Sequence, residues 1–299
     1  MSDGEGVLIL CGPTASGKSA LALELAAVFD AEIVNADSRQ IYRGMPIGTA
    51  APSEEERRRI PHHLYGFLDP HERYSAARYA EDAMRVIGEI RARGKRAIVV
   101  GGTGFYIRTL SGAVDLAPQY DPELRERLRR EAEIHDAEFL HGWLALHDPR
   151  RAAMLHVGDR YRVLRALEIV LARRPPMRTA PLPTLASAGI PFVKVALDLA
   201  NDELDRRIEA RVEAMLEAGF VEEAERIGAD AVAANAVGYP QALAYLRGWC
   251  TTRELRAVLI RATRRYARRQ RTWLRSEPGV IFLAREAVAA LARERLAWS

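Results

Sequence analysis

The chain has 299 residues, and 48% of them are hydrophobic, which is enough to bury a sizeable core in one large domain or two modest ones. Its net charge of +4 is a mild excess, and its two cysteines are too few for a disulfide framework or a cysteine-rich zinc site. The longest apolar runs have the length of a strand and the first residues are acidic, so we expect a cytoplasmic protein without membrane spans or an export signal.

The first hundred residues alternate short apolar strands with helices. A strand at Val7–Cys11 is followed by helical spacing of apolar residues over 19–29. The alternation continues through a strand at Ala31–Asn35, a helix over 75–92 capped by Ser75, and a strand over 96–100. Such alternation predicts an α/β fold with a P-loop NTPase-like parallel sheet core flanked by helices.

The pattern changes near residue 121. Asp121 and Pro122 have the character of an N-cap and a first helical turn, and the chain up to about residue 174 shows helical spacing without a convincing strand. Three apolar residues of this region are expected to form a small core of their own, namely Trp143, Leu144 and Leu146.

A connector follows the helical region. Five of the fifteen prolines fall within residues 175–191, and strand character then resumes over 192–198, with helices over 202–218 and 253–276. We therefore predict an α/β core formed by residues 1–118 and 192–299, interrupted by an all-helical insertion domain at 119–191.

The segment between the first strand and the first helix matches the pattern G-x-x-x-x-G-K-[ST]. Its residues are Gly12, Pro13, Thr14, Ala15, Ser16, Gly17, Lys18 and Ser19. The glycines let backbone N–H groups turn inward around phosphate oxygens, Lys18 supplies a compact positive charge, and the Ser19 hydroxyl can ligate Mg²⁺. The sequence therefore predicts a phosphate-binding loop.

Among the strands predicted in the first hundred residues, only Ala31–Asn35 has an acid close behind it, namely Asp37. Most phosphate loops of this kind work with an aspartate at the end of a second apolar strand, but residues 97–100 are followed by Gly-Gly-Thr-Gly instead. Asp37 could hold Mg²⁺ or act as a base beside the phosphates. The residues alone leave both roles open.

The C-terminal helix is strongly basic. Residues 261–275 contain seven arginines and no acid, with Tyr266 and Trp273 interleaved. Several of these arginines share one stripe at helical spacing. Such a stripe is often only a solvated face, but its charge and aromatic residues favour binding to a phosphate backbone.

Five segments together are more specific than the phosphate loop alone. They are GPTASGKS from Gly12, DSRQIYRGMPIGTA from Asp37, PHHL from Pro61, GGTGFYIR from Gly101, and the basic helix ending in RRQRTWLR. In these segments the chain resembles the bacterial tRNA dimethylallyltransferase family, also called tRNA isopentenyltransferase. The resemblance extends over residues 7–275 and includes the insertion.

The resemblance implies a prenyl transfer to tRNA. In this reaction the dimethylallyl group of dimethylallyl diphosphate passes to the exocyclic N6 amine of the adenosine 3′-adjacent to the anticodon, and pyrophosphate leaves. The loop would then stabilise the departing pyrophosphate, together with Mg²⁺ at Ser19. The implied partners are the anticodon stem-loop of tRNA and dimethylallyl diphosphate, and we expect a monomer.

The resemblance also implies residue roles. Asp37 matches the general base, Thr14 the threonine near the bridging oxygen of the leaving group, and Arg211 an arginine that neutralises it. Several residues match positions that contact tRNA: Asp37, Ser38, Arg39, Gln40, Thr103, Arg125, Tyr161, Arg162, Val163, Leu164 and Arg165. From the basic helix we add Arg268 and Arg269, which could alternatively point to the pyrophosphate.

One departure and three rival hypotheses remain. Pro240 stands where the family usually has a basic or polar residue after Gly-Tyr, so a phosphate contact from that side chain is not expected. The rivals are a small-molecule or nucleotide kinase, a relative that prenylates free adenine nucleotides, and a non-catalytic RNA-binding protein. The helical insertion and the basic helix favour the larger acceptor.

Overall fold

The computed structural model describes residues 6–114, 116, 122–172 and 181–299, and it forms two compact units. One unit comprises Met1–Val114 with Leu182–Ser299, and the other comprises Asp115–Pro181. Residues 182–191, which the sequence analysis assigned to the insertion, fall within the larger unit. There Leu185 is buried, and its N–H donates a hydrogen bond to the carbonyl oxygen of Leu110 at 2.8 Å.

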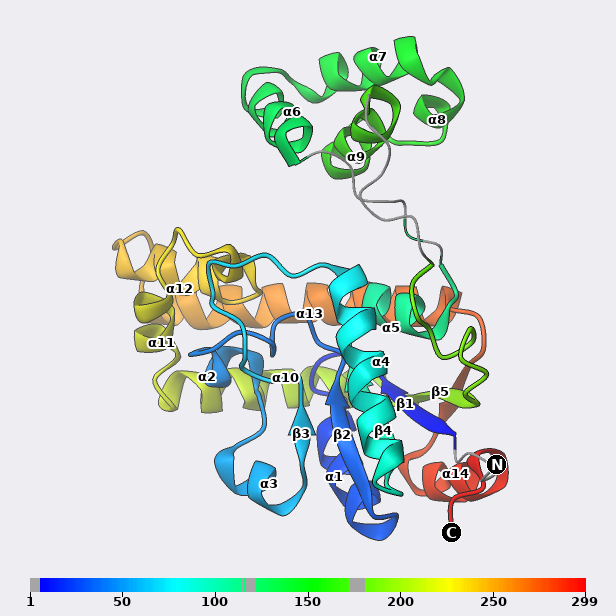
Figure 1. The fold of residues 1–299 in the computed structure, drawn as a ribbon. Helices are drawn as coiled ribbons and strands as arrows, with labels where there is room; N and C mark the ends of the chain where they lie inside the picture. The colour runs from blue at the N-terminus through cyan, green and yellow to red at the C-terminus, as the bar shows by residue number, and fades with distance from the viewer. Residues whose placement is uncertain (1–5, 115, 117–121, 173–180) are drawn as a thin grey trace. The chain divides into compact units, whose positions relative to one another are not determined.

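The larger unit is built on a parallel sheet of six strands. Its spatial order is β3-β2-β4-β1-β5-β6, so the phosphate-loop strand β1 lies between β4 and β5 (Figure 1). The strands are β1 (Val7–Cys11), β2 (Ala31–Asn35), β3 (His62–His63), β4 (Arg96–Gly101), β5 (Phe192–Leu197) and β6 (Val280–Leu283). The middle strands are buried on both faces, as expected for a parallel sheet covered by helices.

Helices cover the two faces of this sheet. On one face, α1 (Lys18–Val28) and α14 (Val288–Leu296) pack their apolar residues against Leu8, Leu10 and Val195. The other face carries α4 (Ala76–Ala92), with α5 (Gly104–Ser111) packed beside it (Figure 1). Because parallel strands all end at the same edge, the loops after β1, β2 and β4 come together there.

A second apolar core joins the C-terminal helices to the loop after β2. It contains residues of α10 (Asn201–Glu217), α11 (Phe220–Ile227), α12 (Tyr239–Leu246) and α13 (Thr252–Ser276). Short elements complete this unit: α2 (Pro46–Thr49), α3 (Glu54–Arg59), η1 (Val232–Asn235) and η2 (Arg285–Ala287). The core places α10 and α13 against the residues that follow β1 and β2.

The smaller unit consists of helices in its described part. They are α6 (Pro122–Ile134), α7 (Ala137–His147), α8 (Pro149–Ala153) and α9 (Arg160–Leu171). Leu144 is fully buried in its core and Trp143 packs against that core, as predicted. The prediction for Leu146 was wrong, because two residues along a helix turn the side chain to the opposite face, and Leu146 is 84% exposed.

The predicted α/β fold is confirmed, and the expected strands and helices lie within one or two residues of their predicted ends. Ser75 accepts a hydrogen bond from the N–H of Arg78 and so caps α4 as expected. The short edge strands β3 and β6 were missed. The proposed N-cap at Asp121 lies outside the described residues. None of the described helices combines the length and apolar character that crossing a bilayer requires.

Candidate active site

The phosphate loop joins β1 to α1 and has the backbone of a phosphate cradle. Ala15 and Gly17 adopt positive φ angles of 62° and 88°, and α1 begins directly afterwards at Lys18. Such left-handed residues turn successive N–H groups toward one point at the positive end of a helix. The Ser16 hydroxyl is buried and has no hydrogen-bond partner among the described residues. A ligand oxygen in the loop could satisfy it.

The Lys18 ammonium lies within the loop. Its Nζ donates a hydrogen bond to the carbonyl oxygen of Pro13 at 3.2 Å. Burial lowers the pKa of Lys18 to about 8; the negative charge of Asp37 opposes this shift and the positive charge of Arg211 adds to it. The lysine is therefore about half charged near pH 8 and fully charged only well below it, unless an anion binds beside it.

Thr14 is held by residues from two distant helices. Arg211 of α10 donates from Nη1 to Thr14 Oγ1 at 2.7 Å and from Nη2 to the carbonyl oxygen of Gly48 at 3.3 Å. Gln270 of α13 accepts a hydrogen bond from the backbone N–H of Thr14 at 2.8 Å. Burial lowers the pKa of Arg211, but a guanidinium starts so high that it stays charged. The loop thus faces a second cation, Arg211, which unlike Lys18 stays charged above pH 8.

Asp37 follows β2 and is shaped by a local turn. Its N–H donates to Asn35 Oδ1 at 2.7 Å, and its own Oδ1 accepts from the N–H of Arg39 at 2.9 Å. Its Oδ2 receives no hydrogen bond from the part of the chain that the structure describes. Asp37 raises the pKa of both Lys18 and Arg211 through its charge, so the carboxylate lies near the two cations of the loop.

The turn after β4 is fastened to the turn after β2. Thr103 Oγ1 accepts from the N–H of Ser38 at 2.9 Å and donates to Ser38 Oγ at 3.2 Å. A Cβ on Gly101 would lie 2.1 Å from the carbonyl oxygen of Ala36, and one on Gly104 would lie 2.2 Å from the Trp273 ring. The glycines of the Gly-Gly-Thr-Gly segment therefore let the backbone of Ala36 and the ring of Trp273 come close, in addition to forming the strand-to-helix turn.

Aromatic side chains line the surroundings of Asp37. Burial raises the pKa of Tyr65, Tyr106 and Tyr266, and the charge of Asp37 adds to each shift. Tyr106 stacks on Tyr79 with ring centroids 4.2 Å apart. These phenols stay neutral near pH 7 and so present hydroxyl groups around the Asp37 carboxylate.

The arginines of α13 divide between two faces. Arg264 pairs with Asp205 at 3.3 Å and Glu209 at 2.5 Å, and Arg271 donates to Asn201 Oδ1 at 2.5 Å, all on α10. Arg268 and Arg269 are exposed, and neither forms an ion pair with a described acidic residue. The Arg269 guanidinium lies 5.7 Å from the centroid of the Tyr266 ring. These two arginines remain available to an external anion.

The predicted tRNA contacts of the smaller unit have mixed environments. Arg125 of α6 pairs with the buried Glu168 of α9 at 2.8 Å and so joins the two helices, and Arg165 pairs with the same carboxylate from within α9 at 2.5 Å. Tyr161 is 81% exposed and Arg162 is also exposed. Val163 lies in the core of this unit, and Leu164 packs against that core, so their side chains are poorly placed for an external partner.

Whether the site can hold Mg²⁺ depends on the oxygen atoms that its residues offer as ligands. In the described part of the chain no cluster of three or more His, Cys, Asp or Glu residues could hold a metal ion. An exposed Ser19 hydroxyl at the start of α1 fits the habit of Mg²⁺, which keeps several waters and takes phosphate oxygens with one or two protein ligands. The residues present therefore fit Mg²⁺ that arrives with a diphosphate.

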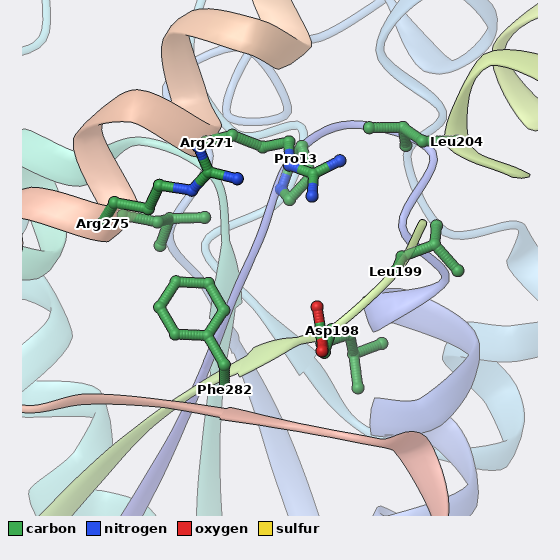
Figure 2. A pocket seen from close by; sticks show the side chains of 9 residues that line it. Pro13, Asp198, Leu199, Leu204, Arg271, Arg275 and Phe282 are labelled. Carbon is green, nitrogen blue, oxygen red and sulfur yellow. The ribbon is translucent and has the colours of Figure 1, made fainter. Parts of the chain in front are cut away.

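A cavity of about 300 Å³ lies beside the loop at the carboxyl ends of β5 and β6 (Figure 2). Its lining does not include Asp37, Thr14 or Arg211. The lining residues are Pro13, Leu197, Asp198, Leu199, Leu204, Arg271, Leu274, Arg275 and Phe282. The cavity therefore adjoins the outer side of the loop and is separate from the cluster around Thr14.

Three residues of the site were not singled out from the sequence. Glu223 is fully buried and accepts hydrogen bonds from Ile47 N–H, Gly48 N–H and Tyr239 OH, which fixes the turn that Arg211 contacts. Arg207 donates to the carbonyl oxygen of Ser16 at 3.3 Å. Gln270 is the third. Signals were present, since Glu223 sits on the apolar stripe of α11 and Arg207 precedes Arg211 by one helical turn.

Comparisons with known proteins agree on one family. A family model described as IPP transferase matches residues 40–277. The chain is 45% identical to a tRNA dimethylallyltransferase of Geobacter sulfurreducens, over 92% of this chain and 90% of the relative.

Solved structures give the same result. A tRNA isopentenylpyrophosphate transferase of Bacillus halodurans has a TM-score of 0.71 and 32% identity, with 98% of this chain and 97% of that chain covered. A eukaryotic dimethylallyltransferase acting on tRNA has a TM-score of 0.76 and 26% identity, with 98% and 77% covered.

Proposed function

This chain belongs to the IPP transferase family, and from that premise we propose that it acts as a tRNA dimethylallyltransferase. The observation that carries the proposal is the cluster at the carboxyl edge of the sheet. There the phosphate loop, Arg211 and the open Oδ2 of Asp37 come together. A diphosphate site next to a carboxylate suits a transfer in which pyrophosphate leaves and an amine loses a proton.

The proposed reaction balances one bond formed against one broken. The N6 amine of the adenosine 3′-adjacent to the anticodon attacks C1 of the dimethylallyl group, and the bond from C1 to the bridging oxygen breaks. The electron pair of that bond leaves with pyrophosphate. Asp37 accepts the proton that the amine loses, which makes it the general base.

The loop stabilises the charge that develops on the leaving group. Its inward-facing N–H groups, Lys18 and Arg211 would surround the pyrophosphate, and Thr14 would approach the bridging oxygen. Ser19 would hold Mg²⁺, which would supply positive charge beside the leaving group. Such preorganised charges act where the negative charge grows, so they favour the transition state over the bound substrate.

The acceptor would reach Asp37 as an unstacked base. Bases in RNA loops can be splayed out and read by hydrogen bonds and stacking. Ser38, Arg39, Gln40 and Thr103 border the position of Asp37, and Arg268 and Arg269 offer charges for the phosphate backbone. In the smaller unit, Tyr161 and Arg162 are the exposed members of the proposed tRNA-contacting segment.

Incubation of the purified protein with labelled dimethylallyl diphosphate, Mg²⁺ and tRNA tests the function. We expect label in the tRNA and an equal amount of released pyrophosphate. A matched anticodon stem-loop that carries purine riboside, which lacks the N6 amine, should take no label. Turnover of labelled ATP alone would reject the proposal in favour of the kinase, which the family match does not favour. Labelling of free adenine nucleotides instead of tRNA would favour the smaller acceptor.

A further inference from the structure

Gln270 lies within the basic helix but does not face solvent. It is 7% exposed, although Arg268 and Arg269 beside it are on the surface. Its Oε1 accepts a hydrogen bond from the backbone N–H of Thr14 at 2.8 Å, and its Nε2 donates to the carbonyl oxygen of Gly102 at 3.0 Å. One side-chain amide thus joins the phosphate loop, the turn after β4 and α13.

The approach of Gln270 requires a glycine at position 102. A Cβ there would lie 2.2 Å from Gln270 Nε2 and 3.0 Å from the carbonyl oxygen of Gly12. The amide accepts from one segment and donates to the other, which neither an ionised carboxylate, an acceptor only, nor an ammonium, a donor only, could do. The contact therefore uses both the oxygen and the nitrogen of the Gln270 amide.

Thr14 is consequently held on two sides. Gln270 holds its backbone N–H, and Arg211 donates to its hydroxyl oxygen. A hydroxyl that accepts from a guanidinium keeps its own hydrogen for donation, and no described residue receives that hydrogen. The free O–H can therefore point to an oxygen of a ligand in the loop.

We propose that Gln270 is a positioning residue that sets the Thr14 hydroxyl for donation to the leaving pyrophosphate. The proposal rests on the function proposed above. Gln270 touches neither substrate; it fixes the peptide unit of Thr14, and Arg211 then fixes the side chain. Loss of the amide would leave the loop able to bind phosphate but would misdirect the hydroxyl, and small errors in orientation are costly in catalysis.

A double-mutant cycle tests this role. Gln270→Met keeps the length of the side chain but neither donates nor accepts as an amide, and Thr14→Val removes only the hydroxyl. We expect Gln270→Met to lower kcat at least tenfold while KM for tRNA stays within twofold. In the Thr14→Val background the same substitution should lower kcat by less than twofold, because the hydroxyl through which Gln270 acts is gone.

The contrary results are distinct. Multiplicative effects of the two substitutions, or an unchanged kcat in Gln270→Met, would overturn the proposal. Thr251→Ala weakens the N-cap of the same helix far from the loop, and its effect on kcat should be small and should persist unchanged in Thr14→Val. If Gln270→Met does not fold, Gln270→Leu carries the cycle, since it too lacks both the acceptor for the Thr14 N–H and the donor to Gly102.

The same cycle can be measured without turnover. Affinity for inorganic pyrophosphate with Mg²⁺ should fall at least threefold in Gln270→Met and show the same non-additivity with Thr14→Val. Additive losses of affinity would contradict the role of Gln270. If the unchanged protein bound pyrophosphate with this non-additivity but transferred no prenyl group to tRNA, the proposed function would be rejected and the positioning role would stand.

Discussion

The phosphate loop and helix α13 are the two regions proposed to bind anions, but they are organised differently. The loop is continuous: one strand, one turn and one helix bring its N–H groups and Lys18 to a single point. The helix presents its residues to three environments, with Arg264 paired to α10, Gln270 buried against the loop, and Arg268 exposed. The role of a contiguous motif can therefore be predicted from its sequence. The roles of residues along a helix can be assigned only when the structure shows which face each residue occupies.

The two regions are also expected to have different tasks, one in the reaction and one in RNA binding. If the loop side carries the reaction and the exposed face of α13 carries RNA affinity, substitutions in the two regions should change different quantities. The largest effect is expected beside the loop, where Asp37→Asn should lower turnover about 10²-fold or more, because the amide cannot accept the proton. Affinity for tRNA, measured by filter binding, should stay within twofold. Unchanged turnover would remove Asp37 from the reaction.

A pH titration examines the loop alone. Because burial lowers the pKa of Lys18 to about 8, the empty loop loses this charge as the pH rises through that value. A bound diphosphate favours the charged form, so binding takes up a proton above pH 8 and weakens with rising pH. We expect about tenfold lower affinity at pH 9 than at pH 7 for an unreactive dimethylallyl thiodiphosphate measured by calorimetry.

The control for that titration is Thr251→Ala, in which the pH dependence should be the same as in the unchanged protein. A flat profile between pH 7 and pH 9 would show that Lys18 keeps its charge in the empty loop. Equal heats in buffers of different ionisation enthalpy would likewise contradict proton uptake.

Substitutions on α13 examine the binding side. Replacing Arg268 and Arg269 by alanine should weaken tRNA binding about fivefold at moderate salt and reduce the slope of log affinity against log salt by up to about 2. Arg264→Ala is the matched control, because this arginine is already paired with Asp205 and Glu209. If Arg264→Ala reduced the salt slope of tRNA binding equally, the two faces of α13 would not differ in their contribution to RNA binding.

The smallest effect concerns stability. Thr251 accepts a hydrogen bond from the N–H of Glu254 and so caps α13. Thr251→Ala should lower the free energy of unfolding by about 1 kcal/mol in urea titrations, because one N–H of the first helical turn loses its partner. Turnover at 25 °C should be unchanged. A large loss of activity would show that the start of the helix also affects the site.

Local patterns predicted much of the fold and part of the site. The strands of the sheet centre, the helix after the loop and the cap at Ser75 depend on neighbouring residues, and all were confirmed. Strand β3 was not predicted because two residues are too few for a periodic pattern. Strand β6 was not predicted because its apolar run is short. The pairing of Arg125 with Glu168, and of Arg264 with α10, depends on contacts between separate elements. No single segment of the sequence could show that these two arginines are already paired with acids on another helix.

The central claim is that the loop from Gly12 to Ser19 holds the leaving diphosphate of a prenyl donor. A crystal structure with dimethylallyl thiodiphosphate, Mg²⁺ and an anticodon stem-loop tests it most directly. The account predicts the diphosphate within the loop in contact with Lys18, and the dimethylallyl carbon between it and the adenine amine at Asp37. A diphosphate bound elsewhere, with the loop empty, would contradict the account.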